Sequence, residues 1–171
     1  MTWTEPATWY ANLPAFYAAT AAFITDSAGN ILLVKPTYRD HWAFPGGYLE
    51  DGEFPHVGCA REVQEELGVS VTVGTLLVVD WASPAGERPR SLIHFTFDCG
   101  ILSDQSDFDL PRQELEDVAF FPPGEAEQRL PDSVSPRIAA AAGARIRLTP
   151  VYLTDGHAPR HQSPGWEARE A

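Results

Sequence analysis

The segment Pro55–Leu67 constrains the fold more than any other part of the chain, because it predicts a helix with two unlike faces. Pro55 suits the first turn of a helix, and Gly68 suits the position just past its end. At about 100° per residue, one face collects the apolar side chains Val57, Ala60, Val63 and Leu67. We therefore expect this helix to pack along that face against a hydrophobic core.

The opposite face of the predicted helix carries Glu62, Glu65 and Glu66 within an arc of about 100°. Carboxylates at these spacings repel by about 0.2–0.5 kcal/mol per pair on an exposed helix, and Arg61 offsets only part of that repulsion. Carboxylate oxygens on one face suit Mg²⁺, which also takes waters and substrate phosphate oxygens as ligands. By itself, however, such a stretch is commonly no more than a solvated surface.

Apolar and β-branched runs on both sides of this helix predict a sheet. Strands are expected at 16–25, 31–36, 69–80, 91–102, 115–121 and 149–154, and further helices at 123–130 and 136–144. The first two strands flank the turn residues 26–30 and should form a hairpin, and the last strand should lie at an edge. A sheet flanked by helices is the layered arrangement that this order favours, so we predict an α/β (α+β) fold with a mixed central sheet.

One domain is expected at 14–156. Residues 1–13 are rich in Trp and Tyr and predict a short helix or arm, which could pack on its own domain or on a dimer partner. Residues 103–113 predict an acidic loop, and the polar residues 157–171 predict a mobile tail.

Composition limits the partners of such a domain. The 171 residues include 12 basic and 24 acidic side chains, a net charge of −12, which disfavours binding to nucleic acid polymers. A small phosphorylated substrate is still compatible if cations bridge the two negative partners. No membrane span and no signal peptide are expected. Cys59 and Cys99 are expected to be reduced thiols in a cytoplasmic protein.

The segment around the acidic helix resembles the Nudix box, Gx5Ex7REUxEExGU, in which U is aliphatic. Every specified position is met, by Gly47, Glu53, Arg61, Glu62, Val63, Glu65, Glu66, Gly68 and Val69. The preceding residues 42–47 (WAFPGG) are similar to the aromatic-x-Pro-Gly-Gly sequence that often leads into this box. The likeness in element order covers roughly residues 14–156 and implies the α/β/α sandwich of the Nudix hydrolases.

This resemblance implies roles for individual residues. Glu62, Glu65 and Glu66 would bind Mg²⁺ or Mn²⁺, and Glu65 could instead be the general base. A backbone carbonyl of Gly46 or Gly47 would complete the metal site. Glu53 would support the metal or its waters, and Arg61 would orient a neighbouring glutamate through charge-assisted hydrogen bonds.

Many members of the family also use an acidic residue far down the chain, followed by an aliphatic residue and a strand that ends in an aromatic pair. Glu114-Leu115 before Phe120-Phe121 resembles this pattern, so Glu114 is the candidate. Glu116, Asp117 and Asp109 are its rivals, and the whole acidic loop could be plain solvated surface.

The implied reaction is attack of water on phosphorus in a small organic diphosphate, such as a nucleoside triphosphate, a nucleotide sugar or an ADP-ribose-like compound. The implied catalytic residues are Glu53, Arg61, Glu62, Glu65 and Glu114. Lys35, Arg39, Trp42 and Arg88 are candidates for contacts to the substrate, because they are cationic or aromatic and lie near the box or in a neighbouring loop. Each of them is equally typical of an exposed loop or a packed core.

Two other functions are compatible with this fold. A Nudix-like sensor would bind a nucleotide without cleaving it, but such modules usually lose box glutamates and this chain keeps them all. An isoprenoid diphosphate isomerase would depart from the box and rely on a cysteine and a glutamate placed differently from those of this chain. Hydrolysis of a non-nucleotide (isoprenyl) diphosphate is a further alternative. A homodimer is implied by the resemblance alone.

Overall fold

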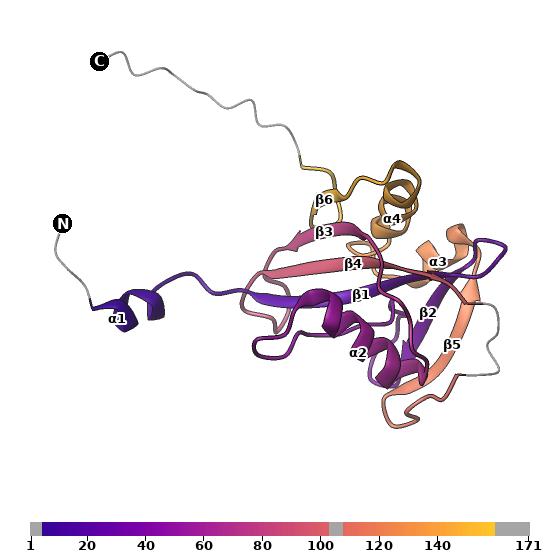
Figure 1. The fold of residues 1–171 in the computed structure, drawn as a ribbon, viewed down its shortest axis with the longest axis horizontal. Helices are drawn as coiled ribbons and strands as arrows, with labels where there is room; N and C mark the ends of the chain where they lie inside the picture. The colour runs from indigo at the N-terminus through magenta and orange to yellow at the C-terminus, as the bar shows by residue number, and fades with distance from the viewer. Residues whose placement is uncertain (1–4, 103–107, 160–171) are drawn as a thin grey trace, which may run out of the picture.

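The computed structural model describes residues 5–102 and 108–159. Figure 1 shows one layered body with a short helix standing apart from it. The helices are α1 (Pro6–Ala11), α2 (Pro55–Leu67), α3 (Pro123–Arg129) and α4 (Pro136–Arg147). The strands are β1 (Tyr17–Thr25), β2 (Ile31–Pro36), β3 (Leu76–Ala82), β4 (Leu92–Ile101), β5 (Leu115–Phe121) and β6 (Val151–Thr154).

The six strands form one mixed sheet in the order β5-β2-β1-β4-β3-β6. The pairs β1–β4 and β3–β6 are parallel, and the pairs β1–β2, β2–β5 and β3–β4 are antiparallel. The predicted hairpin is confirmed as β1 and β2, whose turn is held by the Asp26 carboxylate, which accepts hydrogen bonds from Ala28 N and Asn30 N. The predicted edge strand is confirmed as β6.

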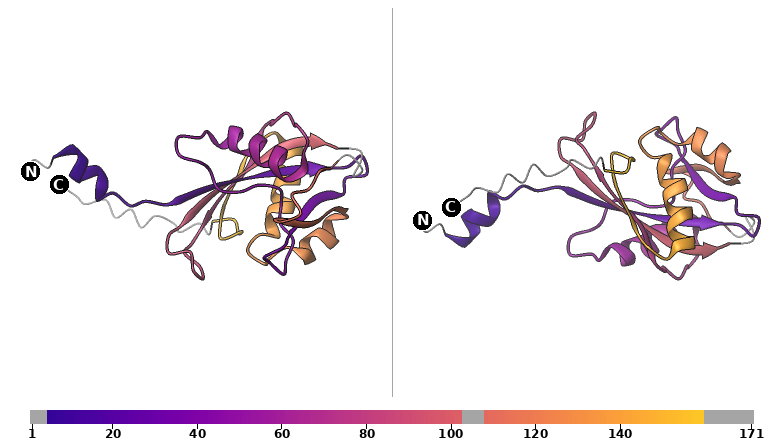
Figure 2. Two further views of the ribbon diagram at one scale, coloured as in Figure 1. Left: turned by 90° about the horizontal axis from the view of Figure 1, so that it is seen from below. Right: turned by 90° about the horizontal axis from the view of Figure 1, so that it is seen from above.

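Helices cover both faces of the sheet, which confirms the predicted α/β/α sandwich. Figure 2 shows α2 on one side and α3 and α4 on the other. Alternate residues of β1 serve the two faces, since Ala22 and Ile24 pack with α2, whereas Ala21 and Phe23 pack with α3 and α4. This alternation is the period-two pattern of a strand that is buried on both faces.

The prediction of a strand over 69–80 is wrong in its first half, because β3 begins only at Leu76. The apolar side chains of the earlier part, Val69, Val71 and Val73, pack against the core under α2. Their alternation therefore reflects packing rather than a ladder of paired backbone groups. The expected helix 136–144 extends further, to Arg147.

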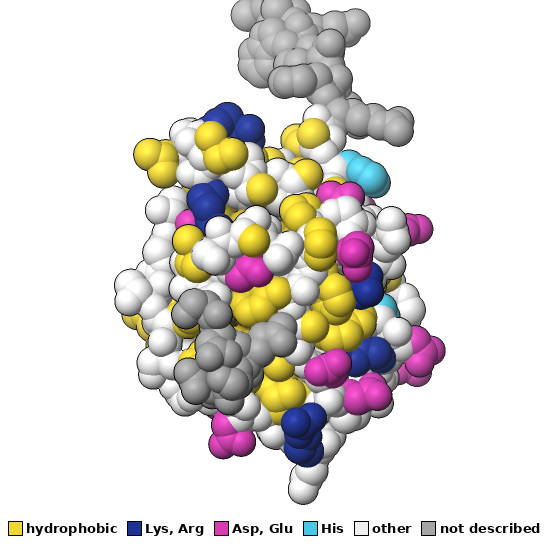
Figure 3. Space-filling view, turned by 90° about the vertical axis from the view of Figure 1, so that its right-hand side faces the viewer, with side chains coloured by type: hydrophobic (Ala, Val, Ile, Leu, Met, Phe, Trp, Pro, Cys, Tyr) yellow, Lys and Arg dark blue, Asp and Glu magenta, His cyan; other side chains and the backbone are white. Residues whose placement is uncertain are grey.

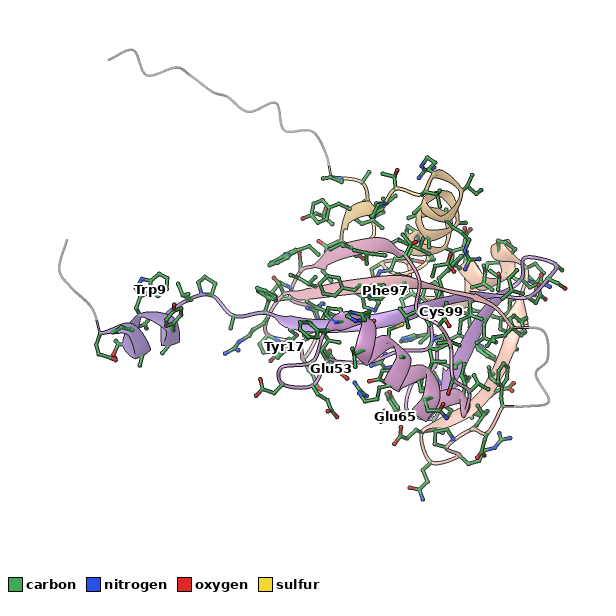
Figure 4. All side chains as sticks on the ribbon, viewed as in Figure 1. Trp9, Tyr17, Glu53, Glu65, Phe97 and Cys99 are labelled. Carbon is green, nitrogen blue, oxygen red and sulfur yellow. The ribbon has the colours of Figure 1, made fainter. Side chains whose placement is uncertain are left out.

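The N-terminal helix α1 is present as expected, but it does not pack on its own domain. Residues 5–16 are all exposed, and Figures 1 and 2 show α1 held away from the sheet. Trp9, which is labelled in Figure 4, is 51% exposed. Packing of this arm on a dimer partner stays a prediction, and residues 1–4, 103–107 and 160–171 of the predicted arm, acidic loop and tail lie outside the described residues.

Cys59 on α2 and Cys99 on β4 are buried free thiols whose sulfur atoms lie 3.7 Å apart. On the face that lies to the right in Figure 1, acidic and basic side chains are interspersed with apolar ones (Figure 3), so the acidic excess is not concentrated there. None of the helices in the described parts of the chain is long and apolar enough to cross a bilayer.

Candidate active site

The loop between β2 and α2 is held directly against strand β1. Thr20 N donates to the carbonyl oxygen of Gly47 at 2.8 Å, and Ala22 N donates to that of Pro45 at 2.8 Å. Gly46 has a φ of +143°, and a Cβ atom at this position would lie 2.2 Å from the carbonyl oxygen of Thr20. Only glycine allows the backbone to come this close, and the approach places the loop beside the acidic face of α2.

Arg61 is at the centre of a network of hydrogen bonds to three glutamate side chains. Its Nε and Nη2 donate to the two oxygens of Glu53 at 2.9 and 3.0 Å, and its Nη1 donates to Glu62 and to Glu65 at 2.9 Å each. The hydrogen bonds from Arg61 lower the pKa of Glu53 to about 2. Figure 4 shows that Glu53 and Glu65 lie beside opposite ends of α2, and Arg61 links them.

Glu66 lies outside this network and is the most perturbed carboxylate of the helix. Gly46 N donates to its Oε2 at 2.8 Å. Burial, together with the negative charges of Glu62, Glu114 and Glu65, raises the pKa of Glu66 to about 8 against the opposing effect of that hydrogen bond. Burial also raises the pKa of Glu62. A buried carboxylate that faces other carboxylates calls for a positive charge.

Glu114 precedes β5, and its carbonyl oxygen accepts a hydrogen bond from Thr37 N at 2.9 Å, just after β2. This pairing of neighbouring strands brings a residue distant in sequence close enough to Glu66 for its charge to act there. The structure thus brings Glu114 to the helix, as its place in the sequence pattern predicts, while its role stays a prediction.

The carboxylates suit Mg²⁺ by their chemistry, because they are hard oxygen ligands around a buried negative charge. Within residues 5–102 and 108–159, however, no three acidic, His or Cys side chains converge on one point that could hold a cation. The hydrogen bonds of Glu62 and Glu65 to Arg61 are one reason. Binding a cation would require at least one of these side chains to turn from Arg61 toward Glu66.

A cavity of about 310 Å³ opens beside Glu66 and Gly47. Three of the four predicted substrate residues, Arg39, Trp42 and Arg88, line it. Lys35 is not among the lining residues, and its ammonium group donates to the carbonyl oxygen of Arg39 instead. Trp42 stands edge-on to Phe121 with 4.8 Å between ring centroids. The indole therefore packs against Phe121 and also borders the cavity.

The cavity is also lined by two residues that were not predicted as site residues, His94 on β4 and Arg137 on α4. Arg137 is only 5% exposed, and its Nε donates at 2.8 Å to the fully buried carboxylate of Asp80. In sequence, Arg137 follows Pro136 in the first turn of a helix, where it is indistinguishable from a surface arginine. Only the packing of α4 on the sheet reveals that it faces a cavity.

Comparison with known proteins places this site in context. The NUDIX domain model matches residues 15–141. An 8-oxo-dGTP diphosphatase of Proteus vulgaris is 43% identical over 61 residues, which cover 33% of this chain and only 54% of that protein. A MutT-like protein of Streptomyces ambofaciens is 27% identical over 137 residues, covering 78% of this chain and 84% of the relative. The crystal structure of the MutT protein from Methanosarcina mazei Go1 superposes with a TM-score of 0.66 at 20% identity, covering 77% and 96% of the two chains, which shows the shared fold.

Proposed function

The chain belongs to the NUDIX family of hydrolases, and from this premise we propose that it uses Mg²⁺ to hydrolyse a phosphoanhydride bond in a nucleoside diphosphate linked to another moiety. The observation that carries the proposal is the position of Glu66. Its carboxylate is close enough to Glu62, Glu65 and Glu114 for their charges to act on it, and it also lines the cavity. A substrate in that cavity would meet the acidic helix with its phosphates.

Mg²⁺, or Mn²⁺ in its place, would be held by Glu62, Glu65 and Glu66 together with a backbone carbonyl at Gly46 or Gly47. When bound, the cation would neutralise phosphate charge and make a water molecule more acidic. The chain's own part is to aim these carboxylates. Arg61 fixes Glu53 through two hydrogen bonds and limits the rotation of Glu62 and Glu65. Gly46 N fixes Glu66.

A proton must leave the water that attacks phosphorus. Glu65 is one candidate base, because its side chain is 59% exposed and reaches solvent. Glu114 is the other, because it comes from a different segment, just before β5, and lies close enough to Glu66 for its charge to act there. A carboxylate within hydrogen-bond reach of that water could take its proton.

Incubation with a substrate panel tests the proposal. The panel contains nucleoside triphosphates, including oxidised ones, nucleotide sugars, ADP-ribose, dinucleotides and isoprenyl diphosphates. With Mg²⁺ we expect release of a nucleoside monophosphate from at least one nucleotide. A chelator should lower the rate at least about 100-fold, because without a cation the negative carboxylates repel the negative phosphates. Chromatographic separation and quantification of the phosphorylated products is the measurement. Binding without cleavage would favour the sensor function, and cleavage of isoprenyl diphosphates alone would contradict a nucleotide substrate.

The raised pKa of Glu66 predicts how stability depends on pH and on metal. A folded-state pKa of about 8 exceeds the ordinary value of 4.5, so this group's contribution to stability is fully present below pH 4.5 and is lost as pH rises through 8. In the presence of a chelator, the free energy of unfolding should fall by about 2 kcal/mol more between pH 6.5 and 8.5 in the wild type than in Glu66→Gln.

Urea unfolding at several pH values measures this difference. Comparison with Glu66→Gln removes the contributions of His94 and the cysteines, because these groups are common to both proteins. Added Mg²⁺ should raise the stability of the wild type more at pH 8.5 than at pH 5, since it binds the ionised form. Parallel pH curves for the two proteins would show that Glu66 is not the group in question.

A further inference from the structure

Two residues on the cavity wall, Arg137 and His94, carry hydrogen-bonding groups that have no partner among the described residues. Arg137 uses Nε for Asp80, but its Nη1 and Nη2 have no hydrogen-bond partner among the described residues. His94 Nδ1 is also unpartnered in that part of the chain, but it is fully buried, whereas the terminal nitrogens of Arg137 are not. Buried polar groups are rarely left unpaired, and a charged guanidinium is among the costliest to leave so. The two terminal nitrogens of Arg137 are free to donate on the cavity wall, so they point to a ligand that supplies acceptors.

This part of the cavity wall is poorly suited to a phosphate group. The charge of Arg137 is already balanced by the fully buried Asp80 at 2.8 Å. Arg88 adds a positive charge that acts on Arg137, but its terminal nitrogens already donate to the carbonyl oxygens of Arg90 and Ser83. His94 pairs with Asp80 across strands β4 and β3, and burial together with the charge of Arg137 keeps the pKa of His94 well below its usual range. A neutral imidazole offers one donor and one acceptor. This mixture fits a neutral polar molecule better than an anion.

Trp42 adds an aromatic surface to the cavity. Since the phosphates belong at the acidic helix, the organic part of the substrate would contact the other lining residues, among them Trp42, His94 and Arg137. A flat ring with polar edges satisfies both surfaces, because it can contact the indole and hydrogen-bond to Arg137 and His94. Among the substrates of the proposed hydrolase, the nucleobase has these properties.

Resting on the proposed function, we infer that Arg137 selects the nucleobase, and that it selects bases with two adjacent acceptor atoms, guanine and cytosine, over adenine and uracil. The two terminal nitrogens of a guanidinium donate in parallel, so they match a pair of neighbouring acceptors. Guanine presents O6 beside N7, whereas adenine presents an amino donor beside N7. Cytosine presents O2 beside N3, whereas uracil carries a hydrogen on N3.

Binding of nucleoside monophosphates tests this selection without relying on catalysis, because these ligands contain no phosphoanhydride bond. Calorimetric titration of the full chain with GMP, CMP, AMP and UMP should give at least tenfold tighter binding of GMP and CMP. A mispaired donor at a buried site is discriminated by at least this factor. Loss of N7 alone, in 7-deaza-GMP, should weaken binding at least tenfold relative to GMP, and this arm needs no protein variant.

Arg137→Lys keeps a cation beside Asp80 but removes the two parallel donors of the guanidinium. It should weaken the binding of GMP and CMP at least tenfold and change the binding of AMP by less than twofold. Arg145→Lys on the same helix is the matched control, because Arg145 donates to Asp98, Thr25 and the Phe23 carbonyl and is not among the cavity residues. It should leave the order of the four nucleotides unchanged, and thermal unfolding of both variants identifies any loss of fold.

Three results would overturn the inference. They are equal binding of all four monophosphates, equal binding of GMP and 7-deaza-GMP, and competition by ribose 5-phosphate or inorganic phosphate as strong as that by GMP, which would make this part of the cavity wall an oxyanion site. Hydrolysis of the nucleotide panel is measured separately. Base-selective binding without hydrolysis would overturn only the proposed function, and hydrolysis without base preference would overturn only the role of Arg137.

Discussion

Replacing Glu66 with Gln is expected to lower kcat by about 10²–10⁴-fold and to leave the protein folded. Glu66 is the carboxylate that joins the acidic helix to the cavity, and its amide counterpart would lose the charge that a cation needs. The same change should stabilise the metal-free protein at pH 8, because burial raises the pKa of Glu66 to about 8 and a neutral amide avoids that cost. Activity and stability thus move in opposite directions, which a folding defect cannot produce.

Steady-state kinetics on the best substrate of the panel, together with urea unfolding, gives both quantities. Glu65→Gln should also lower kcat by orders of magnitude, but with little effect on stability, because Glu65 is exposed and its contact is the surface ion pair with Arg61. Glu127→Gln, on the exposed side of α3, is the control and should change neither. Near-normal activity in both box variants would exclude the assigned site.

Gly46→Ala is expected to cost about 3–5 kcal/mol of unfolding free energy and to abolish most of the activity. A Cβ atom there would lie 2.2 Å from the carbonyl oxygen of Thr20 and 2.8 Å from Ala21 Cα. Both neighbours are backbone atoms of the central strand β1, so neither can turn aside as a side chain would. Moving the loop instead would withdraw Gly46 N from Glu66.

Gly29→Ala is the matched control for this change. Gly29 also has a positive φ, +84°, but nothing lies within 4 Å of its Cβ position. It should cost only about 1–2 kcal/mol, the strain of a left-handed residue with a side chain. Chemical denaturation of the two variants separates backbone strain from crowding. Equal losses at both positions would mean that the contact with Thr20 is unimportant.

The sequence predicts the arrangement of the acidic residues well, because they are local, while their catalytic role stays a prediction. Glu53, Arg61 and Glu66 lie within one loop and one helix, where spacing along the chain fixes spacing in the structure. The strands of the hairpin and the layered fold were also predictable from the period of apolar residues. The prediction of a strand was wrong for residues 69–75, since Val69, Val71 and Val73 alternate as in a strand but pack without forming a ladder of backbone hydrogen bonds.

The recognition half of the site could not be predicted, because it is assembled from distant elements. Asp80, His94 and Arg137 come from β3, β4 and α4, and each is unremarkable in its own segment. Their proximity depends on the antiparallel pairing of β3 with β4 and on how α4 lies across them. Glu114 shows the intermediate case, in which a sequence pattern suggested the residue and the β2–β5 pairing brought it near Glu66.

The two faces of the sheet have consequences for how such a chain can change over time. The helix with the reactive carboxylates packs on one face, and the helix that carries Arg137 packs on the other. Mutations on α4 can therefore alter which substrate is accepted while the packing beneath α2 stays the same. An ancestor of this chain could have exchanged one substrate for another by drift on one side of the molecule, with its chemistry inherited intact on the other.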